Sequence, residues 1–359
     1  MRLVPKILPT DISGCFLVGA KPPGADRTAV PGGAHVLLCR PGFEVECHAE
    51  SQSASAPPTP GSGWILVDGP VLSAARPFRS LVFARDRFAG EAFAILDPTD
   101  RVGPLLSLAA AYGPVGTLWL QHADSTEGRS LAKLCQRLQG RMEGGLRSAG
   151  LISPGSRRRL HVMFLDGRSG FIGVSEADDG ALWSMGVPRL RLAGAPSRSA
   201  AKLEEGLLWF LGETAGSLLA SGMSAVDLGA APGGWTWVLA RRGLRVTAVD
   251  HGKLAREAEE AGAVRHLSAD AFTYRPPRPV DWMVCDVVDK PARTAELVQR
   301  WLGQGWCRRT IFNLKLPMKQ RLAEVERILA RLRTIPGLRL QARQLYHDRE
   351  EITVFAARS

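Results

Sequence analysis

The segment from Ala225 to Trp237 constrains the local structure of this chain more than any other. A short apolar run ends at Asp227, several glycines and Pro232 follow, and an apolar stretch begins at Trp235. The apolar run predicts a buried strand, the glycines and the proline predict a turn, and the last stretch predicts the start of a helix. In an open α/β sheet, such a turn lies at the carboxyl end of a strand, where ligands bind.

The glycines of this turn narrow the choice of ligand. Gly229, Gly233 and Gly234 have no Cβ, so they can adopt backbone angles closed to other residues and let a ligand approach the main chain. Their spacing is G-x-x-x-G-G, whereas nicotinamide-binding proteins carry G-x-G-x-x-G. A nicotinamide cofactor is therefore the weaker match.

Three later segments also read as strands that end in an aspartate: residues 244–250, 264–270 and 281–286. The first of these acids, Asp250, is placed to hold ribose hydroxyl groups. Because the carboxyl ends of parallel strands meet at one edge of a sheet, we expect one acidic rim. In any α/β domain a single strand can end in an acidic turn residue, but such residues are not expected at the ends of four strands. The rim is predicted to consist of Asp227, Asp250, Asp270 and Asp286.

This arrangement resembles the Rossmann-like methyltransferases that use S-adenosylmethionine. The resemblance implies that residues 229–234 pass around the methionine end of the cofactor, that Asp250 holds its ribose and that Asp270 reaches its adenine. Ser199 either caps the next helix or reaches the cofactor, and Trp235 is either a core side chain or a wall of the pocket. The implied cofactor-binding residues are Ser199, Asp227, Gly229, Ala231, Pro232, Gly233, Gly234, Trp235, Asp250, Asp270 and Asp286.

The composition points to a polyanionic partner. The 359 residues include 46 Lys and Arg against 35 Asp and Glu, which gives a formal net charge of +11. Such an excess favours nucleic acid, although general solubility would also account for it. The six cysteines form no C-x-x-C pair, and no apolar run is long enough to span a membrane. We expect a cytoplasmic protein in a reducing compartment, a monomer without metal or membrane contacts.

The domain organisation follows from stretches rich in Pro, Gly and Ser. The unit before the linker resembles the THUMP domain, an RNA-binding module, in its order of elements and in the Asp-Ser-Thr at 124–126. We expect a flexible extension over residues 1–33, a ferredoxin-like α+β subdomain over 34–97, a THUMP-like domain over 98–192, a linker over 193–201 and a Rossmann-like catalytic domain over 202–359.

Several individual elements are predicted from apolar periodicity. In the catalytic domain we expect a mostly parallel seven-stranded sheet whose last two strands form an antiparallel hairpin. Elsewhere we expect a strand at residues 77–85 and helices at residues 131–138, 142–149 and 202–219.

The acceptor side of the site carries four charged residues. The pattern after the fourth strand, Cys285-Asp286-Val287-Val288, lacks the Pro-Pro-aromatic sequence of amine methyltransferases and the Pro-Cys of pyrimidine C5 methyltransferases. The order Lys202, Asp286, Lys315, Glu351 instead resembles the tetrad of ribose 2′-O-methyltransferases of the FtsJ type. The loop of those enzymes is also close to Asp-Leu-Gly-Ala-Ala-Pro-Gly-Gly-Trp.

Longer motifs resemble the RlmM family, which 2′-O-methylates a cytidine of bacterial 23S ribosomal RNA. They are Asn-Leu-Lys-Leu-Pro-Met-Lys at 313–319 and Gln-Leu-Tyr-His-Asp-Arg-Glu-Glu at 344–351. The resemblance implies ribosomal RNA, or its precursor particle, as partner. Further RNA contacts are expected at Lys319 and at the basic run Arg157, Arg158 and Arg159, although a short charge run is often only solvated.

Two questions stay open at this point. Lys315 either removes the 2′-hydroxyl proton or donates a hydrogen bond to the oxygen, because Lys202 would lower its pKa whereas Asp286 and Glu351 would raise it. The other classes of function are an inactive RNA-binding or assembly protein, a small-molecule methyltransferase and an enzyme that methylates a base. His347 has no second ligand at metal-binding spacing, so we interpret it as a turn residue.

Overall fold

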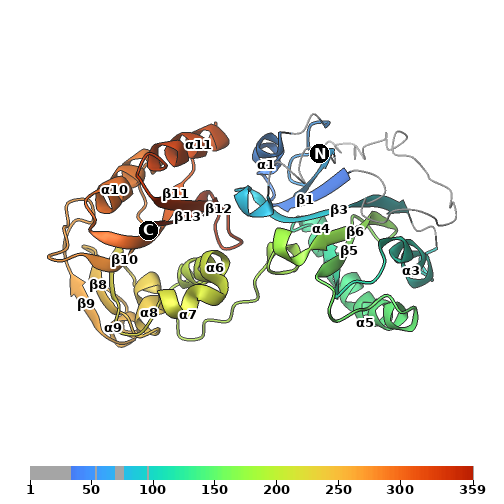
Figure 1. Ribbon diagram of the computed structural model, residues 1–359, viewed down its shortest axis with the longest axis horizontal. Helices are drawn as coiled ribbons and strands as arrows, with labels where there is room; N and C mark the ends of the chain where they lie inside the picture. Colours follow the sequence, from blue (N-terminus) through green and yellow to red (C-terminus); the bar gives the residue numbers. More distant parts are fainter. Residues whose placement is uncertain (1–33, 53–54, 69–76, 95–96, 359) are drawn as a thin grey trace, which may run out of the picture.

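Two sheets organise the protein, each with helices packed against it (Figure 1). The computed structural model describes residues 34–52, 55–68, 77–94 and 97–358. The predicted flexible extension over residues 1–33 lies outside these ranges. In this part of the chain, no helix has both the length and the apolar character needed to cross a membrane.

The N-terminal half is built on a six-stranded sheet in the order β2-β1-β3-β6-β5-β4. Only β4 and β5 run parallel, and the other neighbours are antiparallel. Because β3 pairs with β6, strands from residues 34–97 and from residues 98–192 share one sheet. The elements are β1 (Ala34–Cys39), α1 (Glu44–Ser51), β2 (Trp64–Asp68), η1 (Phe78–Ser80), β3 (Ala84–Ala94), α3 (Val102–Ala109), η2 (Ala110–Tyr112), β4 (Thr117–His122), α4 (Thr126–Arg129), α5 (Ala132–Ser148), β5 (Arg158–Phe164), β6 (Ser169–Glu176), η3 (Ala177–Asp179) and η4 (Ser184–Gly186).

The C-terminal half contains a seven-stranded sheet in the order β12-β13-β11-β10-β7-β8-β9. β13 is antiparallel to both of its neighbours, and the remaining pairs are parallel, which confirms the predicted fold class. The elements are α6 (Ala200–Leu211), η5 (Gly212–Thr214), α7 (Ala215–Leu218), β7 (Ser224–Leu228), α8 (Gly234–Ala240), β8 (Arg245–Val249), α9 (Arg256–Glu259), β9 (Val264–Leu267), β10 (Val280–Cys285), α10 (Pro291–Gly303), β11 (Cys307–Lys315), α11 (Arg321–Leu332), β12 (Leu338–Arg343) and β13 (Glu351–Arg358).

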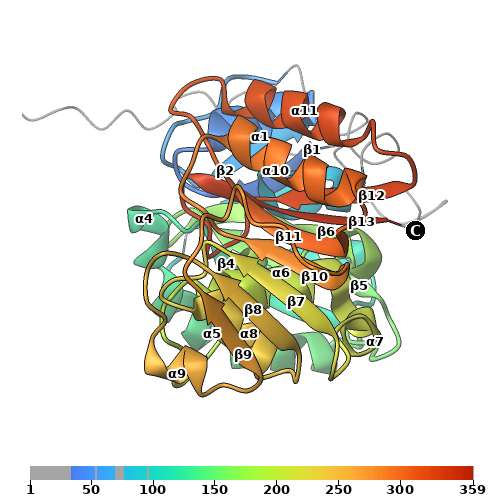
Figure 2. The ribbon, with the colours of Figure 1, turned by 90° about the vertical axis from the view of Figure 1, so that its left-hand side faces the viewer.

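Helices cover both faces of this second sheet. α10 and α11 lie side by side on one face, and α6 and α8 lie on the other (Figure 2). In α11 the buried residues Val325, Ile328, Leu329 and Leu332 recur at helical spacing, so one stripe of the helix packs on the sheet. β7 and β10 are buried along most of their length, which explains why most of their residues are apolar.

The strand predicted at residues 77–85 is wrong. The segment forms the short helix η1 and a connection, and the strand β3 begins only at Ala84. The reason is the buried carboxylate of Glu50, which accepts hydrogen bonds from the backbone N–H groups of Val82 (2.6 Å), Phe83 (2.9 Å) and Ala84 (3.0 Å). This carboxylate accepts from backbone N–H groups that would otherwise pair with a neighbouring strand. The apolar run therefore crosses the core without joining the sheet before Ala84.

Two helix predictions also differ from the structure. The helices expected at residues 131–138 and 142–149 are one continuous helix, α5, because Gly140 between them does not interrupt its hydrogen bonding. The helix expected at residues 202–219 ends at Leu211, since Gly212 takes a φ of 49°. A glycine at positive φ is a common helix terminator.

Arg343, at the end of β12, connects the two halves of the protein. Its guanidinium is 3% exposed and donates hydrogen bonds to the carbonyl oxygens of Ala84 and Leu81. It also lies over the rings of Trp209 (3.9 Å to the centroid) and Phe78 (4.4 Å). One buried cation therefore joins a strand of the second sheet to the segment that precedes β3.

Replacing Arg343 with Met is expected to destabilise the protein by about 2–4 kcal/mol, because two buried carbonyl groups lose their donor and Glu50 loses a nearby cation. Urea and thermal unfolding would measure the change. Arg339→Met is the matched control, because Arg339 lies on the same strand and is exposed. Equal stability of the two variants would show that Arg343 does not hold the halves together.

Candidate active site

The turn after β7 has the backbone that its glycines predict. Gly229 and Gly233 have φ values of 75° and 107°, which side chains other than glycine rarely adopt. A Cβ on Gly229 would lie 2.5 Å from Val287 Cγ1, and one on Gly233 would lie 2.3 Å from Ala258 Cβ. The peptide bond between Ala231 and Pro232 in this turn is cis. The turn is therefore packed too closely for larger residues.

Gly234 and the linker serines meet at the start of α8. A Cβ on Gly234 would lie 2.4 Å from the Oγ atoms of both Ser197 and Ser199. These two hydroxyl groups are 2.7 Å apart, and the Ser199 side chain caps no helix, so the capping alternative does not hold. Trp235 is buried and donates its indole N–H to the Ser199 carbonyl oxygen (3.0 Å), so it belongs to the core.

The predicted acidic rim follows the strand order β10-β7-β8-β9. Asp250, after β8, accepts hydrogen bonds from the N–H groups of Ala231 (3.0 Å) and Gly252 (2.7 Å). Asp270 accepts one from Phe272 N–H (2.9 Å). These acids hold the turns around them, and each carboxylate keeps lone pairs for a further donor.

Asp227 differs from the other acids of the rim because it is buried. Its carboxylate accepts a hydrogen bond of 2.6 Å from Thr236 Oγ1 in the first turn of α8. Burial raises the pKa of Asp227 to about 7, and the neighbouring Asp286 and Asp250 charges add to the increase. Asp227 therefore ties β7 to the helix that follows the turn.

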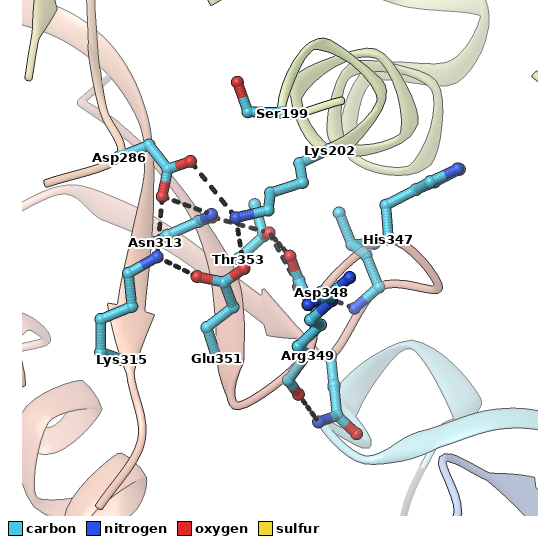
Figure 3. Close-up of polar contacts among 12 residues, drawn as sticks. Ser199, Lys202, Asp286, Asn313, Lys315, His347, Asp348, Arg349, Glu351 and Thr353 are labelled. Atoms are coloured by element: carbon cyan, nitrogen blue, oxygen red, sulfur yellow. Dashed lines mark hydrogen bonds and ion pairs between the residues drawn. The ribbon is translucent and has the colours of Figure 1, made fainter. Parts of the chain in front are cut away.

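The four residues of the predicted tetrad meet in one place, although they come from four elements (Figure 3). Lys202 lies on α6, Asp286 follows β10, Lys315 ends β11 and Glu351 begins β13. Asp286 contacts Lys315 Nζ at 3.0 Å and Lys202 Nζ at 3.3 Å. Glu351 pairs with both lysines, one through each carboxylate oxygen. Positive and negative groups thus alternate around a closed ring, called the charge ring below.

The charge ring orients both lysines and keeps Lys315 protonated. Burial alone would lower the pKa of Lys315, but the Asp286 and Glu351 carboxylates outweigh it and raise that pKa above its ordinary value. Burial likewise opposes ionisation of Glu351, yet the two lysines lower its pKa. An ammonium group has three N–H donors, and the ring carboxylates take two from each lysine, so one remains.

A second set of polar side chains supports the ring and was not predicted from the sequence. In the antiparallel pairing of β11 and β13, Lys315 lies opposite Glu351, and Asn313 lies opposite Thr353. Asn313 Nδ2 donates to Asp286 Oδ1 (3.1 Å), and Thr353 Oγ1 donates either to Asn313 Oδ1 (2.9 Å) or to Asp348. The sequence feature that could have revealed them is their spacing. Asn313 and Thr353 each lie two residues from a ring residue, Lys315 or Glu351, and therefore on the same face of the strand.

The N-terminal half holds the loop that leads into Glu351. Arg40 donates a hydrogen bond to the Asp348 carbonyl oxygen (2.7 Å), and Val82 accepts one from Gln344 N–H (2.7 Å). The guanidinium of Arg85 lies 5.3 Å from the ring centroid of Tyr346. Residues 344–350, named the clamp loop here, are thus fixed from both halves.

The clamp loop also contains His347. Its Nδ1 lies 2.6 Å from the Glu205 carboxylate, which accepts the His347 backbone N–H as well (3.0 Å). Among the residues that the structure describes, no three His, Cys, Asp or Glu side chains are arranged to hold a metal ion.

The basic residues predicted to contact RNA fall into two groups. Arg157 pairs with Asp178, and Arg158 pairs with Glu176 at 3.4 Å. Arg159 donates to the Ala181 carbonyl oxygen (2.6 Å) and lies over the Trp119 ring. All three arginines therefore already have partners within the N-terminal half. In contrast, Lys319 is exposed and has no partner among the described residues.

Comparisons with known proteins identify relatives of this chain. A family model described as "FtsJ-like methyltransferase" matches residues 195–302, and one described as "Ribosomal RNA large subunit methyltransferase M, N-terminal" matches residues 100–176. The protein named ribosomal RNA large subunit methyltransferase M from Azotobacter vinelandii is 46% identical over 90% of this chain and 98% of its own. The protein of the same name from Xanthomonas axonopodis pv. citri is 44% identical over 90% and 99%.

These matches span nearly the whole length of the relatives, and they confirm the resemblance drawn from the sequence. The two family models match different halves of the chain, so both halves have a known counterpart. The chain therefore belongs to the ribosomal RNA large subunit methyltransferase M family.

Proposed function

We propose that this protein transfers a methyl group from S-adenosylmethionine to the 2′-oxygen of a ribose in large-subunit ribosomal RNA. The observation that carries the proposal is the charge ring at the carboxyl edge of the sheet, beside the glycine turn. The ring offers N–H donors on lysines that carboxylates hold in position, and a hydroxyl oxygen is an acceptor for such donors.

The glycine turn supports S-adenosylmethionine as the cofactor. Gly229 and Gly233 expose main chain where a Cβ would collide with a neighbour, and Asp250 keeps acceptor capacity for ribose hydroxyls. Residues 229–234 would hold the methionine end, Asp250 the ribose and Asp270 the adenine. When bound, the cofactor supplies a methyl group activated by its positively charged sulfur.

The residues of the charge ring then have separate tasks. Lys315 donates its remaining N–H to the ribose oxygen, and Asp286 and Glu351 fix the direction of that bond. The oxygen–carbon bond forms as the sulfur–carbon bond breaks, and the hydroxyl proton leaves. Because Lys315 is already protonated, that proton passes to a ring carboxylate or to solvent.

The acceptor is proposed to be RNA on two grounds. The 2′-hydroxyl is the group that distinguishes RNA from DNA, and the net charge of +11 suits a polyanion. The relatives carry large-subunit ribosomal RNA in their names. We propose a cytidine as the modified nucleotide from the motif at residues 313–319, which resembles that of enzymes acting on 23S ribosomal RNA.

The Lys315→Ala variant is expected to bind S-adenosylmethionine normally and to lose about 10³-fold in kcat, because it removes the donor to the ribose oxygen. Calorimetry would measure binding, and nucleoside mass spectrometry of digested RNA would measure 2′-O-methylation. Arg308→Ala is the control, since Arg308 is an exposed cation at the other end of the same strand. Retained turnover in Lys315→Ala would remove this residue from the mechanism.

The pH dependence of kcat distinguishes a hydrogen-bond donor from a base. Because the pKa of Lys315 is raised above its ordinary value near 10.4, its charged form persists through the neutral range. If Lys315 is a hydrogen-bond donor, kcat is expected to be constant from about pH 7 to 9 and to fall only as the pH rises through the pKa of Lys315. A tenfold rise in kcat per pH unit over the same range would instead identify Lys315 as a base.

Replacing Gly234 with Ala is expected to weaken cofactor binding at least tenfold, because the added Cβ would push Ser197 and Ser199 out of place. Gly216→Ala is the matched control, since a Cβ at that position meets no atom within 4 Å. Calorimetric titration with S-adenosylmethionine gives the two dissociation constants. Equal values would separate the serine pair from the cofactor site.

A further inference from the structure

A groove with no assigned role lies between the segments that follow β10 and β11. It has a volume of about 530 Å³, and its lining includes Lys290, Pro291, Ala292, Pro317, Lys319 and the ion pair of Glu324 with Arg327. That volume is within the range of sites that hold a small organic molecule. Its two walls come from α10 and α11, which lie side by side (Figure 2).

The groove begins where the charge ring ends. Pro317 follows Lys315 by two residues, a separation of about 7 Å at most along an extended chain. Lys290 and Pro291 follow Asp286 along the other wall. The Leu316 N–H is fixed by the Glu350 carbonyl oxygen (2.8 Å), so the wall that contains Pro317 is tied to the clamp loop. The groove lining therefore begins two residues after Lys315 and four residues after Asp286 in the chain.

The polar residues of the groove favour an anion. Lys290 and Lys319 are exposed and stand on opposite walls, and their ammonium groups form no ion pair among the described residues. Arg327, farther along α11, is different because Glu324 holds it through two hydrogen bonds of 2.7 and 3.0 Å. Two ammonium groups without an ion pair among the described residues thus line the groove together with its prolines and alanines, while the Glu324 carboxylate is paired with Arg327.

Exposed apolar side chains occur on the same two segments. In the described ranges only three large apolar side chains are exposed: Val45 (62%), Val288 (90%) and Met318 (92%). Val288 lies between Asp286 and Lys290, and Met318 lies between Pro317 and Lys319. Apolar surface is costly to leave in water, and isolated cases are common, but two on the segments that supply the walls of one groove suit a bound partner.

We propose that this groove is the subsite for the acceptor nucleotide of the RNA, and this inference rests on the proposed function. The nucleobase leaves its stack and lies against the prolines and alanines of the groove, beside Val288 and Met318. Lys290 and Lys319 bind the phosphates on either side of that nucleotide. A flat apolar base and two flanking negative charges match the two chemistries that the groove combines.

The test uses the full-length protein, labelled S-adenosylmethionine and unmodified large-subunit ribosomal RNA. In the double variant Lys290→Ala/Lys319→Ala we expect the KM for RNA to rise about 10- to 100-fold with kcat within about twofold. The slope of log KM against log salt should become shallower by about 0.7–0.9 for each phosphate that the protein no longer neutralises. Arg333→Ala, an exposed cation at the far end of α11, should match the wild type.

The position of the base is tested separately, after the methylated nucleotide has been mapped on the wild-type product. Met318→Asp should raise the KM about tenfold with intact RNA. With RNA that lacks the acceptor base, the same substitution should have little further effect, because the base that Met318 would touch is already absent. Additive effects of the substitution and the missing base would overturn the placement of the base.

Other outcomes also decide the matter. A wild type that methylates ribose, together with a double variant of unchanged KM and salt slope, would overturn the groove and leave the proposed function standing. A defect seen only with assembled particles, and not with naked RNA, would indicate a protein contact and also overturn it. A wild type that methylates no ribose would remove the proposed function itself.

Discussion

The antiparallel pairing of β13 with β11 is the constraint on which the candidate site depends. It places Lys315 opposite Glu351 and, two residues away, Asn313 opposite Thr353. A shift of one residue would turn each of these side chains to the other face of the sheet. The buried neighbours Leu314 and Ile352, which also face each other, resist such a shift, because it would remove them from the core packing that they have now. The apolar core thus fixes the register that assembles the charge ring.

The same pairing begins at a loop that the catalytic half does not hold alone. Residues 344–350 accept a hydrogen bond from Arg40, contact Arg85 through the Tyr346 ring, and donate backbone N–H groups to Val82 of the N-terminal half and to Glu205 of their own half. The Glu351 carboxylate therefore owes its position to contacts from distant parts of the chain. Contacts therefore connect the two halves of the protein at this loop. The linker at residues 193–201 remains a prediction.

The sequence allowed the catalytic fold and the ring residues to be predicted, because glycines, strand-end acids and the tetrad are local or motif-based signals. The Asn313–Thr353 pair was missed, since neither residue type is unusual in a strand and only the register joins them. The error at residues 77–85 has a similar origin. Glu50, distant in sequence, replaces a strand partner, and buried charges such as Arg85, Asp86 and Arg87 give β3 a polar appearance. Contacts between side chains that are distant in sequence produce no periodic pattern in the sequence, so they could not be predicted from it.

The clamp loop has a consequence for how such a protein can evolve. Modular enzymes gain new substrates by exchanging one domain for another, which requires that few contacts cross the boundary. Here the backbone of residues 344–350 and the side chain of Arg343 take partners from Arg40, from β3 and from the segment before β3. A foreign N-terminal unit would leave those polar groups unmatched next to Glu351. The two halves are therefore expected to be inherited together, and to change by point substitution and not by recombination.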